Sequence, residues 1–198
     1  YVDTDKAFYF SPFDYYKTAT EDASGKALNK AIFEGKERLT EKGKQHIVGI
    51  QSQLWSEKIS GAEAMEYMLL PKLLGYAERA WAAEPAWSKE TDSLKSWSHY
   101  LKDWNQFANL LGKRELPRLR YYASGFKFRV PPPGVVVKDG KVSANVQFPG
   151  LIVKYTTNGS EPTLQSKTYT APIQQPLEIK LKVFVGELGS KTVSIKRQ

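Results

Sequence analysis

Residues 46–83 read HIVGIQSQLWSEKISGAEAMEYMLLPKLLGYAERAWAA. The stretch opens with a short apolar run rich in β-branched residues, residues 47–50, which predicts a buried strand. Ser60-Gly61-Ala62-Glu63 has the form of a helix capping box, and the apolar residues after it predict a helix that ends near Ala83. A strand followed by a capped helix predicts one βα unit, in which binding sites lie at the carboxyl end of the strand.

A tryptophan and a carboxylate follow the predicted strand. Trp55 and Glu57 are two residues apart, so they point to the same side if the strand continues. An indole face can cover the apolar face of a pyranose ring, and a carboxylate accepts hydrogen bonds from its hydroxyls, so the pair suits a sugar site. A core tryptophan at a strand end and a glutamate that caps the next helix explain a single W-x-E pattern equally well.

A longer set of motifs resembles the β-N-acetylhexosaminidases of glycoside hydrolase family 20, which include chitobiases. The similar segments are QSQLWSE at 51–57, EYMLLPKLL at 66–74 and AERAW at 77–81. They are similar to the last strand and helix of the catalytic barrel in that family. The resemblance implies that this region ends a (β/α)8 barrel. It also implies that Trp55 lines the pocket of a terminal N-acetylhexosamine and that Glu57 binds the outer hydroxyls of that sugar.

The first three residues, Tyr1-Val2-Asp3, are similar to a Tyr-x-Asp that ends the preceding barrel strand in the family. The resemblance implies that the Tyr1 hydroxyl binds the acetamido carbonyl of the substrate and that Asp3 helps to hold its outer hydroxyls. The alternative is an ordinary strand followed by a packed loop, because aromatic residues crowd the segment that follows.

Catalysis in this family is substrate-assisted and departs from the usual two-carboxylate scheme. The 2-acetamido oxygen attacks the anomeric carbon, an Asp orients that group, and the adjacent Glu protonates the leaving oxygen. No Asp-Glu dipeptide occurs in the 198 residues. The resemblance therefore implies a catalytic pair upstream in the same polypeptide and an inactive fragment here, with no catalytic residue of its own.

Two helices are predicted in residues 61–111. Pro71 lies inside the first and should bend it, because proline lacks the N–H that the helix requires. The second, residues 91–111, carries one apolar stripe, and Gly112 after it suits a helix C-terminus. The stripe consists of Leu94, Trp97, Leu101, Trp104, Ala108 and Leu111.

Composition excludes several classes of site. The net charge is +8, but the basic residues are scattered and no nucleic-acid motif accompanies them. No apolar run has the 18 or so residues of a membrane span. The absence of cysteine excludes disulfides and thiolate metal sites, and neither His46 nor His99 lies in a metal-binding pattern, so no metal or cofactor is predicted. The chain begins at tyrosine, which suggests the end of a longer protein, and the resemblance implies a secreted, periplasmic or cell-surface location.

The composition changes at a proline-rich stretch. Residues 1–115 are predicted to be the barrel end with its closing helices, and residues 116–133, which end in Pro131-Pro132-Pro133, a stiff connector. Residues 134–198 consist of short apolar runs separated by turn residues, including Asp139-Gly140, which predicts a small β-sandwich. The predicted fold class is therefore α+β, with two domains.

The predicted sandwich also resembles the fibronectin-like C-terminal domain that follows some hexosaminidase barrels. The similar segment is IVKYTTNGSEPT at 152–163, with Tyr169 and Pro172-Ile173. Its aromatic residues lie within or beside the strand runs, so they should fill the core or pair across strands, without sugar affinity. They are Phe148, Tyr155, Tyr169 and Phe184.

Two other functions remain compatible with the sequence. One is a non-catalytic carbohydrate-binding module that uses Trp55 and surface aromatic residues. The other is a structural accessory protein in which the sandwich is a spacer.

Overall fold

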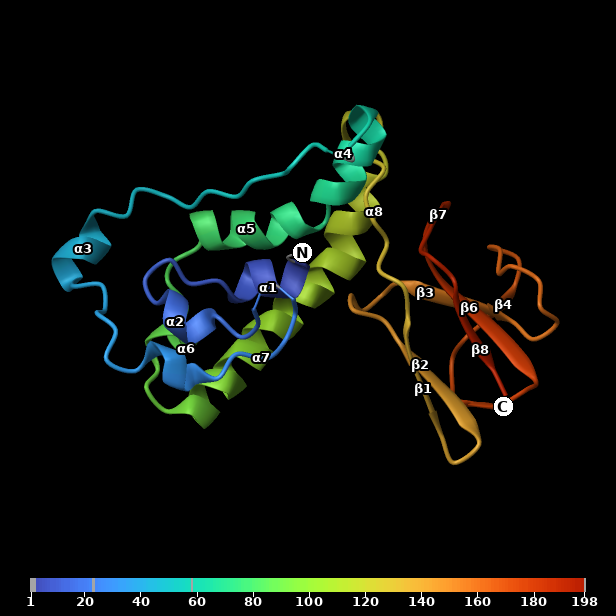
Figure 1. Cartoon of the computed structure of the whole chain (residues 1–198). Helices are drawn as coiled ribbons and strands as arrows, with labels where there is room; N and C mark the ends of the chain where they lie inside the picture. Colours follow the sequence, from blue (N-terminus) through green and yellow to red (C-terminus); the bar gives the residue numbers. More distant parts are fainter. Residues whose placement is uncertain (1–2, 23, 58, 198) are drawn as a thin grey trace. The chain divides into compact units, whose positions relative to one another are not determined.

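The computed structural model describes residues 3–22, 24–57 and 59–197 (Figure 1). It divides into two compact units, Tyr1–Ser60 with Leu69–Trp104, and Gly61–Met68 with Asn105–Gln198. In the described ranges, every strand longer than a single bridge falls in the second unit. The chain thus combines helices with antiparallel sheets, while the domain boundaries 1–115, 116–133 and 134–198 stay predictions.

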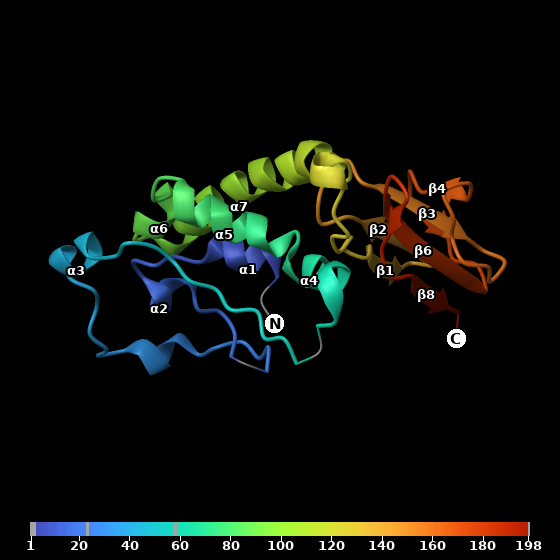
Figure 2. The same cartoon turned by 90° about the horizontal axis from the view of Figure 1, so that it is seen from above.

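The first unit is built from short helices around α1 (Thr4–Tyr9) and α5 (Lys72–Trp81), which pack side by side (Figure 2). Gly75 permits this approach, because a Cβ atom there would lie 2.8 Å from the Thr4 carbonyl oxygen. The remaining elements of the unit are α2 (Tyr15–Thr18), η1 (Lys30–Phe33), α3 (Glu41–Gln45), α6 (Ala86–Lys89) and most of α7 (Ser93–Leu110).

An aromatic cluster forms the core of this unit. Trp87 is fully buried, and its ring stacks on Tyr9 with ring centroids 5.1 Å apart. Tyr100 packs edge-on against both rings, at 4.6 Å from Tyr9 and 5.7 Å from Trp87. Phe8 extends the cluster to Trp104, at 5.6 Å. Large ring areas removed from water make this cluster the main source of stability in the unit.

The predicted strand at residues 47–50 is wrong for this structure. Residues 47–56, hereafter the irregular segment, run from α3 toward α4 (Gly61–Leu69) without belonging to a sheet, and Val48 is fully exposed. Figure 1 shows this segment as a long trace without a strand arrow. The described part of the chain offers it no neighbouring strand, so its backbone N–H and C=O groups lack the partners that a strand requires.

Pro71 interrupts the helical region, in agreement with the sequence. Helix α4 ends at Leu69 and α5 begins at Lys72, so the two residues Leu70 and Pro71 separate them. Proline cannot donate the hydrogen bond that would continue the helix, and its ring clashes with the preceding turn. The covalent structure of proline is therefore sufficient to explain where the helix is interrupted.

The predicted helix end at Gly112 is wrong. After α7, the chain continues through one π-helical turn, η2 (Leu111–Glu115), into α8 (Leu116–Leu119). A Cβ atom at Gly112 would lie 2.2 Å from the Pro149 carbonyl oxygen and 2.9 Å from the carbonyl carbon of Phe148. The glycine therefore permits a close backbone approach within the second unit instead of ending the helix.

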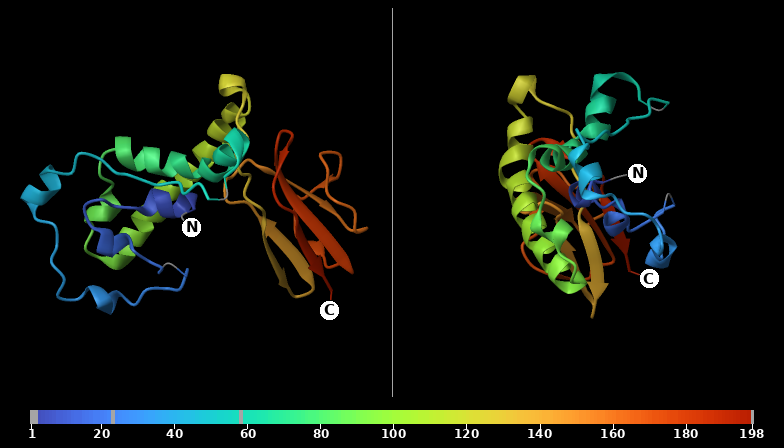
Figure 3. Two further views of the ribbon diagram at one scale, coloured as in Figure 1. Left: turned by 45° about the horizontal axis from the view of Figure 1, so that its top comes forward. Right: turned by 90° about the vertical axis from the view of Figure 1, so that its left-hand side faces the viewer.

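The strands of the second unit form two antiparallel sheets (Figure 3). In the first, β2 (Lys141–Asn145) lies between β1 (Gly134–Lys138) and β5 (Ile173–Gln174). The second has the order β4-β3-β6-β7, and β8 also pairs with β6. Its strands are β3 (Ile152–Thr156), β4 (Lys167–Thr168), β6 (Glu178–Val185), β7 (Leu188–Gly189) and β8 (Val193–Lys196).

The core of this unit confirms two of the expected aromatic positions, since Phe148 and Phe184 are buried. Tyr169 connects the two sheets. Its N–H donates to the Val153 carbonyl of β3 at 2.9 Å, and its hydroxyl accepts from the Ala144 N–H of β2 at 2.9 Å. The fully buried aliphatic residues around them are Val142, Ile179, Leu181 and Val183.

Candidate functional site

Trp55 lies near the end of the irregular segment and Glu57 directly follows that segment, both at exposed positions. The Trp55 side chain is 76% exposed, which is unusual for an indole that only fills a core. Glu57 is exposed, and the hydrogen bonds and ion pairs described for the chain do not include its carboxylate. The interpretation as a core tryptophan therefore does not hold in this structure, and both groups are available to a ligand.

Asp3 and Tyr1 were the other two predicted binding residues. Asp3 is half-buried at the start of α1, where its carboxylate accepts a hydrogen bond from the Thr4 N–H at 2.7 Å. A carboxylate at a helix N-terminus stabilises the helix, so Asp3 has a structural role whatever else it binds. Tyr1 lies outside the described residues. Asp3, Trp55 and Glu57 do not line the pockets beside residues 47–50, 124–127 or 88–91.

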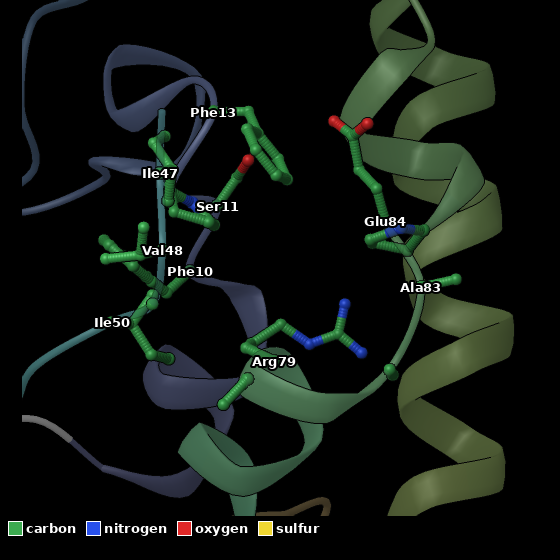
Figure 4. Close-up of a pocket in the computed structure, with 14 residues that line it drawn as sticks. Phe10, Ser11, Phe13, Ile47, Val48, Ile50, Arg79, Ala83 and Glu84 are labelled. Carbon is green, nitrogen blue, oxygen red and sulfur yellow. The ribbon is translucent and has the colours of Figure 1, made fainter. Parts of the chain in front are cut away.

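A pocket of about 260 Å³ adjoins the irregular segment (Figure 4). Residues 47–50 form one side and the loop at residues 10–13 another. The third side is the end of α5 with the residues that follow it, namely residues 79, 80 and 82–85. Apolar side chains dominate the first two sides, while Arg79 and Glu84 are the charged residues that line it.

Arg79 is a buried cation in this pocket that the sequence analysis left without a role. Its side chain is 6% exposed, and its Nε–H has no hydrogen-bond partner in the described structure. The guanidinium lies over the Phe8 ring at 4.6 Å, and the Glu78 carboxylate is 3.6 Å away, beyond hydrogen-bond range. Burial lowers the pKa of Arg79 from its ordinary value. Its position in the sequence could have indicated this burial. Arg79 follows Gly75 by four residues, so both lie on the face of α5 that packs against α1.

Glu84 does not neutralise that cation. Its carboxylate accepts from the Ser88 hydroxyl at 3.0 Å and pairs with Lys89 at 3.2 Å. Figure 4 shows the Glu84 carboxylate turned away from the Arg79 guanidinium. Space and donor capacity therefore remain beside Arg79 for an acceptor group from elsewhere.

Trp55 and Glu57 are thus exposed groups, whereas Arg79 is a buried cation in the pocket beside residues 47–50. Within the described residues, no three His, Cys, Asp or Glu side chains are grouped so as to hold a metal ion. The helices of the described chain are all too short or too polar to cross a bilayer.

Comparison with known proteins identifies both parts of the chain. Residues 1–84 match the model of the glycosyl hydrolase family 20 catalytic domain, and residues 115–192 match that of the chitobiase/beta-hexosaminidase C-terminal domain. These are the two families that the sequence motifs resemble, in the predicted order.

Three bacterial relatives support the assignment. The N,N'-diacetylchitobiase of Vibrio harveyi is 32% identical over 206 residues, which cover 98% of this chain and 22% of that protein. A beta-hexosaminidase of Vibrio vulnificus is 30% identical over 129 residues, with 57% of this chain and 15% of that protein covered. A beta-hexosaminidase of Porphyromonas gingivalis is 24% identical over 162 residues, with coverages of 77% and 18%.

The chain thus spans between 15% and 22% of the length of the relatives that it matches. Residues 1–84 belong to the glycosyl hydrolase family 20 catalytic domain, and residues 115–192 belong to the chitobiase/beta-hexosaminidase C-terminal domain family.

Proposed function

We propose that this chain is the C-terminal part of a β-N-acetylhexosaminidase. The whole enzyme removes terminal N-acetylhexosamine residues from glycans or chitooligosaccharides by substrate-assisted retaining catalysis. The main support is the match of the two segments, in order, to a family 20 catalytic domain and its C-terminal companion. The exposure of Trp55, next to a carboxylate without described protein partners, agrees with this function.

In this proposal the chain supplies one wall of the sugar pocket. Trp55 stacks on the apolar face of the terminal sugar, and Glu57 accepts hydrogen bonds from its outer hydroxyls. Tyr1 and Asp3 contribute the acetamido contact and a further hydroxyl contact. The Asp-Glu pair that orients the acetamido group and protonates the leaving oxygen comes from the upstream polypeptide, so these 198 residues alone do not hydrolyse substrate.

The irregular segment supports the need for upstream residues. Residues 47–50 are apolar and β-branched, yet the described chain pairs them with no strand. A neighbouring barrel strand from the upstream part would satisfy their backbone groups and cover Val48. The same part could bring an acceptor to the buried Arg79 guanidinium, whose Nε–H lacks one.

The two-sheet unit is a passive companion in this proposal, with a fibronectin-like sandwich fold that follows the connector at residues 116–133. Its aromatic side chains are engaged within the unit. Phe148 and Phe184 are buried, and Tyr169 bonds to both sheets. We place the whole enzyme outside the cytoplasm, as a secreted, periplasmic or cell-surface protein, because the family resemblance implies that location.

Substitution of Glu57 in the intact enzyme tests the proposal. Charge-assisted hydrogen bonds contribute about 1.5–3 kcal/mol, so Glu57→Gln should lower kcat/KM roughly ten- to a hundredfold. Trp55→Ala should lower it at least as much through lost stacking area. Because Glu57 is exposed and without described partners, its variant should keep the melting temperature of the parent.

Glu63→Gln is the matched control, since Glu63 is also an exposed glutamate, in α4. It should retain normal kinetics. A role of Glu57 as a helix cap makes the opposite forecast: a lower melting temperature with unchanged kinetics per folded molecule. Normal turnover by Glu57→Gln would end the assignment of Glu57 to the sugar pocket.

A further inference from the structure

The first unit contains a second pocket of about 480 Å³, on elements that the proposed sugar pocket does not use. It shares no lining residue with the pocket beside the irregular segment. Its size falls within the range of roughly 300–1,000 Å³ that is typical of small-molecule sites. The lining residues come from α1, α2, α6 and α7 and their loops: Tyr9, Asp14, Lys17, Lys30, residues 88–91, Ser93, Ser96 and Trp97.

A supported aromatic plate forms part of this pocket. Trp97 is 51% exposed, although one side of its ring stacks on Tyr100 with centroids 5.0 Å apart and planes at 29°. The Tyr9 ring meets Trp97 edge-on at 6.3 Å, and Tyr9 in turn stacks on the fully buried Trp87. The indole is thus held by core residues while much of its surface stays open. Such a plate loses little conformational entropy when a ligand covers it.

Polar groups of both kinds surround the plate. One Asp14 oxygen accepts from the Lys17 N–H at 3.0 Å and from the Arg38 guanidinium at 3.3 Å, and one Glu90 oxygen accepts from the Asp92 N–H at 3.1 Å. Each carboxylate retains acceptor capacity after these bonds, because it can accept about four hydrogen bonds. The Tyr9 hydroxyl has no hydrogen bond among those described. Burial raises its pKa, so it stays protonated and able to donate at neutral pH.

The charges in the pocket favour a neutral ligand. The Lys17 ammonium already donates to the carbonyl oxygens of Ser88, at 3.1 Å, and Glu90. The Lys30 ammonium is likewise engaged by the carbonyl oxygens of Tyr16 and Lys17. The pocket is lined by three ammonium groups, of Lys17, Lys30 and Lys89, and by the carboxylates of Asp14 and Glu90, and the Lys89 ammonium pairs with Glu84. Charges of both signs therefore lie beside the plate, and neither sign selects a highly charged ligand. An aromatic plate edged with remaining acceptor oxygens and a hydroxyl donor matches a pyranose, which has apolar faces and hydroxyl edges.

We propose that this pocket is a second glycan-binding site, in which one pyranose of a neutral N-acetylglucosamine oligosaccharide stacks on Trp97 and hydrogen-bonds Asp14, Glu90 and the Tyr9 hydroxyl. The choice of N-acetylglucosamine rests on the proposed function, whereas the choice of a neutral sugar rests on the pocket itself. Such a site would hold a polymeric substrate near the enzyme and raise its local concentration.

Titration of the 198-residue chain with chitotriose, followed by calorimetry and by NMR, tests this proposal. The expected dissociation constant is about 1 mM, and Trp97→Ala should weaken binding at least tenfold. Trp97→Phe keeps a smaller ring and should show an intermediate affinity, which provides a second variant if the alanine variant unfolds. Tyr9→Phe keeps the ring but loses the hydroxyl, and it should weaken binding several-fold.

Trp81→Ala is the matched control, because Trp81 is 90% exposed and lines neither of these two pockets. It should bind chitotriose like the parent chain. The proposal fails if the parent chain shows no binding at about 10 mM sugar. It also fails if Trp97→Ala binds normally, or if Trp81→Ala loses as much affinity.

Failure of the second site is distinguishable from failure of the proposed function. Hydrolysis by the intact enzyme that depends on Glu57, with no effect of Trp97→Ala on chitotriose binding, would refute only the second site. Trp97-dependent binding by an intact protein without hydrolase activity would refute only the proposed enzyme.

Discussion

Strand β6 and the start of the irregular segment both contain β-branched apolar residues, but they have different structures. β6 reads EIKLKVFV and residues 47–50 read IVGI, so both contain β-branched apolar residues, although charged residues alternate with them in the first half of β6. In β6, Val183 is fully buried and opposite Val153 of β3, whereas Val48 is fully exposed without a strand partner. Strand β6 has β3 along one edge and β7 with β8 along the other. Intrinsic preference selects candidates for strands, and hydrogen-bonded neighbours decide which of them form.

The largest expected effect contrasts a glycine of the second unit with a glycine of the irregular segment. Gly112→Ala places a Cβ atom 2.2 Å from the backbone oxygen of Pro149. Neither backbone can yield cheaply in a packed unit, so the variant should lose about 3 kcal/mol of unfolding free energy, measured by urea denaturation.

Gly49→Ala is the control, because nothing lies within 4 Å of the added atom in the irregular segment. Its unfolding free energy should stay within about 0.5 kcal/mol of the parent. Equal losses at both glycines would show that the irregular segment is as tightly packed as the second unit.

A pair of valines makes the comparison at the level of side chains. Val183→Ala removes two methyl groups from a fully buried site, and it should cost about 2 kcal/mol of unfolding free energy. Val48→Ala should change it by less than about 0.5 kcal/mol, since that side chain is already in water.

The same pair measured in the intact enzyme sharpens the comparison. If an upstream strand covers residues 47–50 there, Val48→Ala should become costly, by about 1–2 kcal/mol. A neutral Val48→Ala in the intact enzyme would contradict the proposed pairing.

Loss of the Tyr169 hydrogen bond between the two sheets should lower the unfolding free energy by a smaller amount. Tyr169→Phe removes the acceptor of the Ala144 N–H, so it should cost about 1 kcal/mol of unfolding free energy. Tyr155→Phe is the control, because no described hydrogen bond involves the Tyr155 hydroxyl. Chemical denaturation of the two variants compares them directly. An equal loss of unfolding free energy in both variants would mean that loss of any tyrosine hydroxyl is destabilising. It would not support a specific contribution from the hydrogen bond between the sheets.

The smallest effect concerns pH. The Glu161 carboxylate accepts from the Thr192 hydroxyl at 2.6 Å and from Lys180 at 2.9 Å, and these bonds lower its pKa below the ordinary value of 4.5. Because the folded pKa is the lower one, the stability from this group is present above the unfolded pKa. It is lost as pH falls through the folded pKa.

The melting temperature should therefore decline as the pH falls below about 4.5, and Glu161→Gln should flatten part of that decline. Glu187→Gln, at an exposed position in the same unit, is the control. Identical acid melting profiles for the parent and Glu161→Gln would show that these hydrogen bonds are not maintained in solution.

Much of the local structure follows from residue chemistry alone. Pro71 separates α4 from α5 because proline lacks an N–H. Asp139 and Gly140 form the tight turn between β1 and β2, and both have positive φ angles, which Asp and Gly tolerate. The motifs around Trp55 and Glu57 predicted the family, because the order and spacing of residues can be compared between sequences without knowledge of their packing.

Tertiary contacts decided the rest, because the relevant neighbours are far apart in the sequence. Residues 47–50 had the composition of a strand, but no partner strand exists in the described chain. Gly112 had the position of a helix terminator, but it serves as the contact point with the Phe148–Pro149 backbone. The Trp97 plate depends on Tyr9 and Tyr100, which come from different helices. A sequence pattern records the properties of each residue, whereas these roles depend on which distant backbone or ring the fold places beside it.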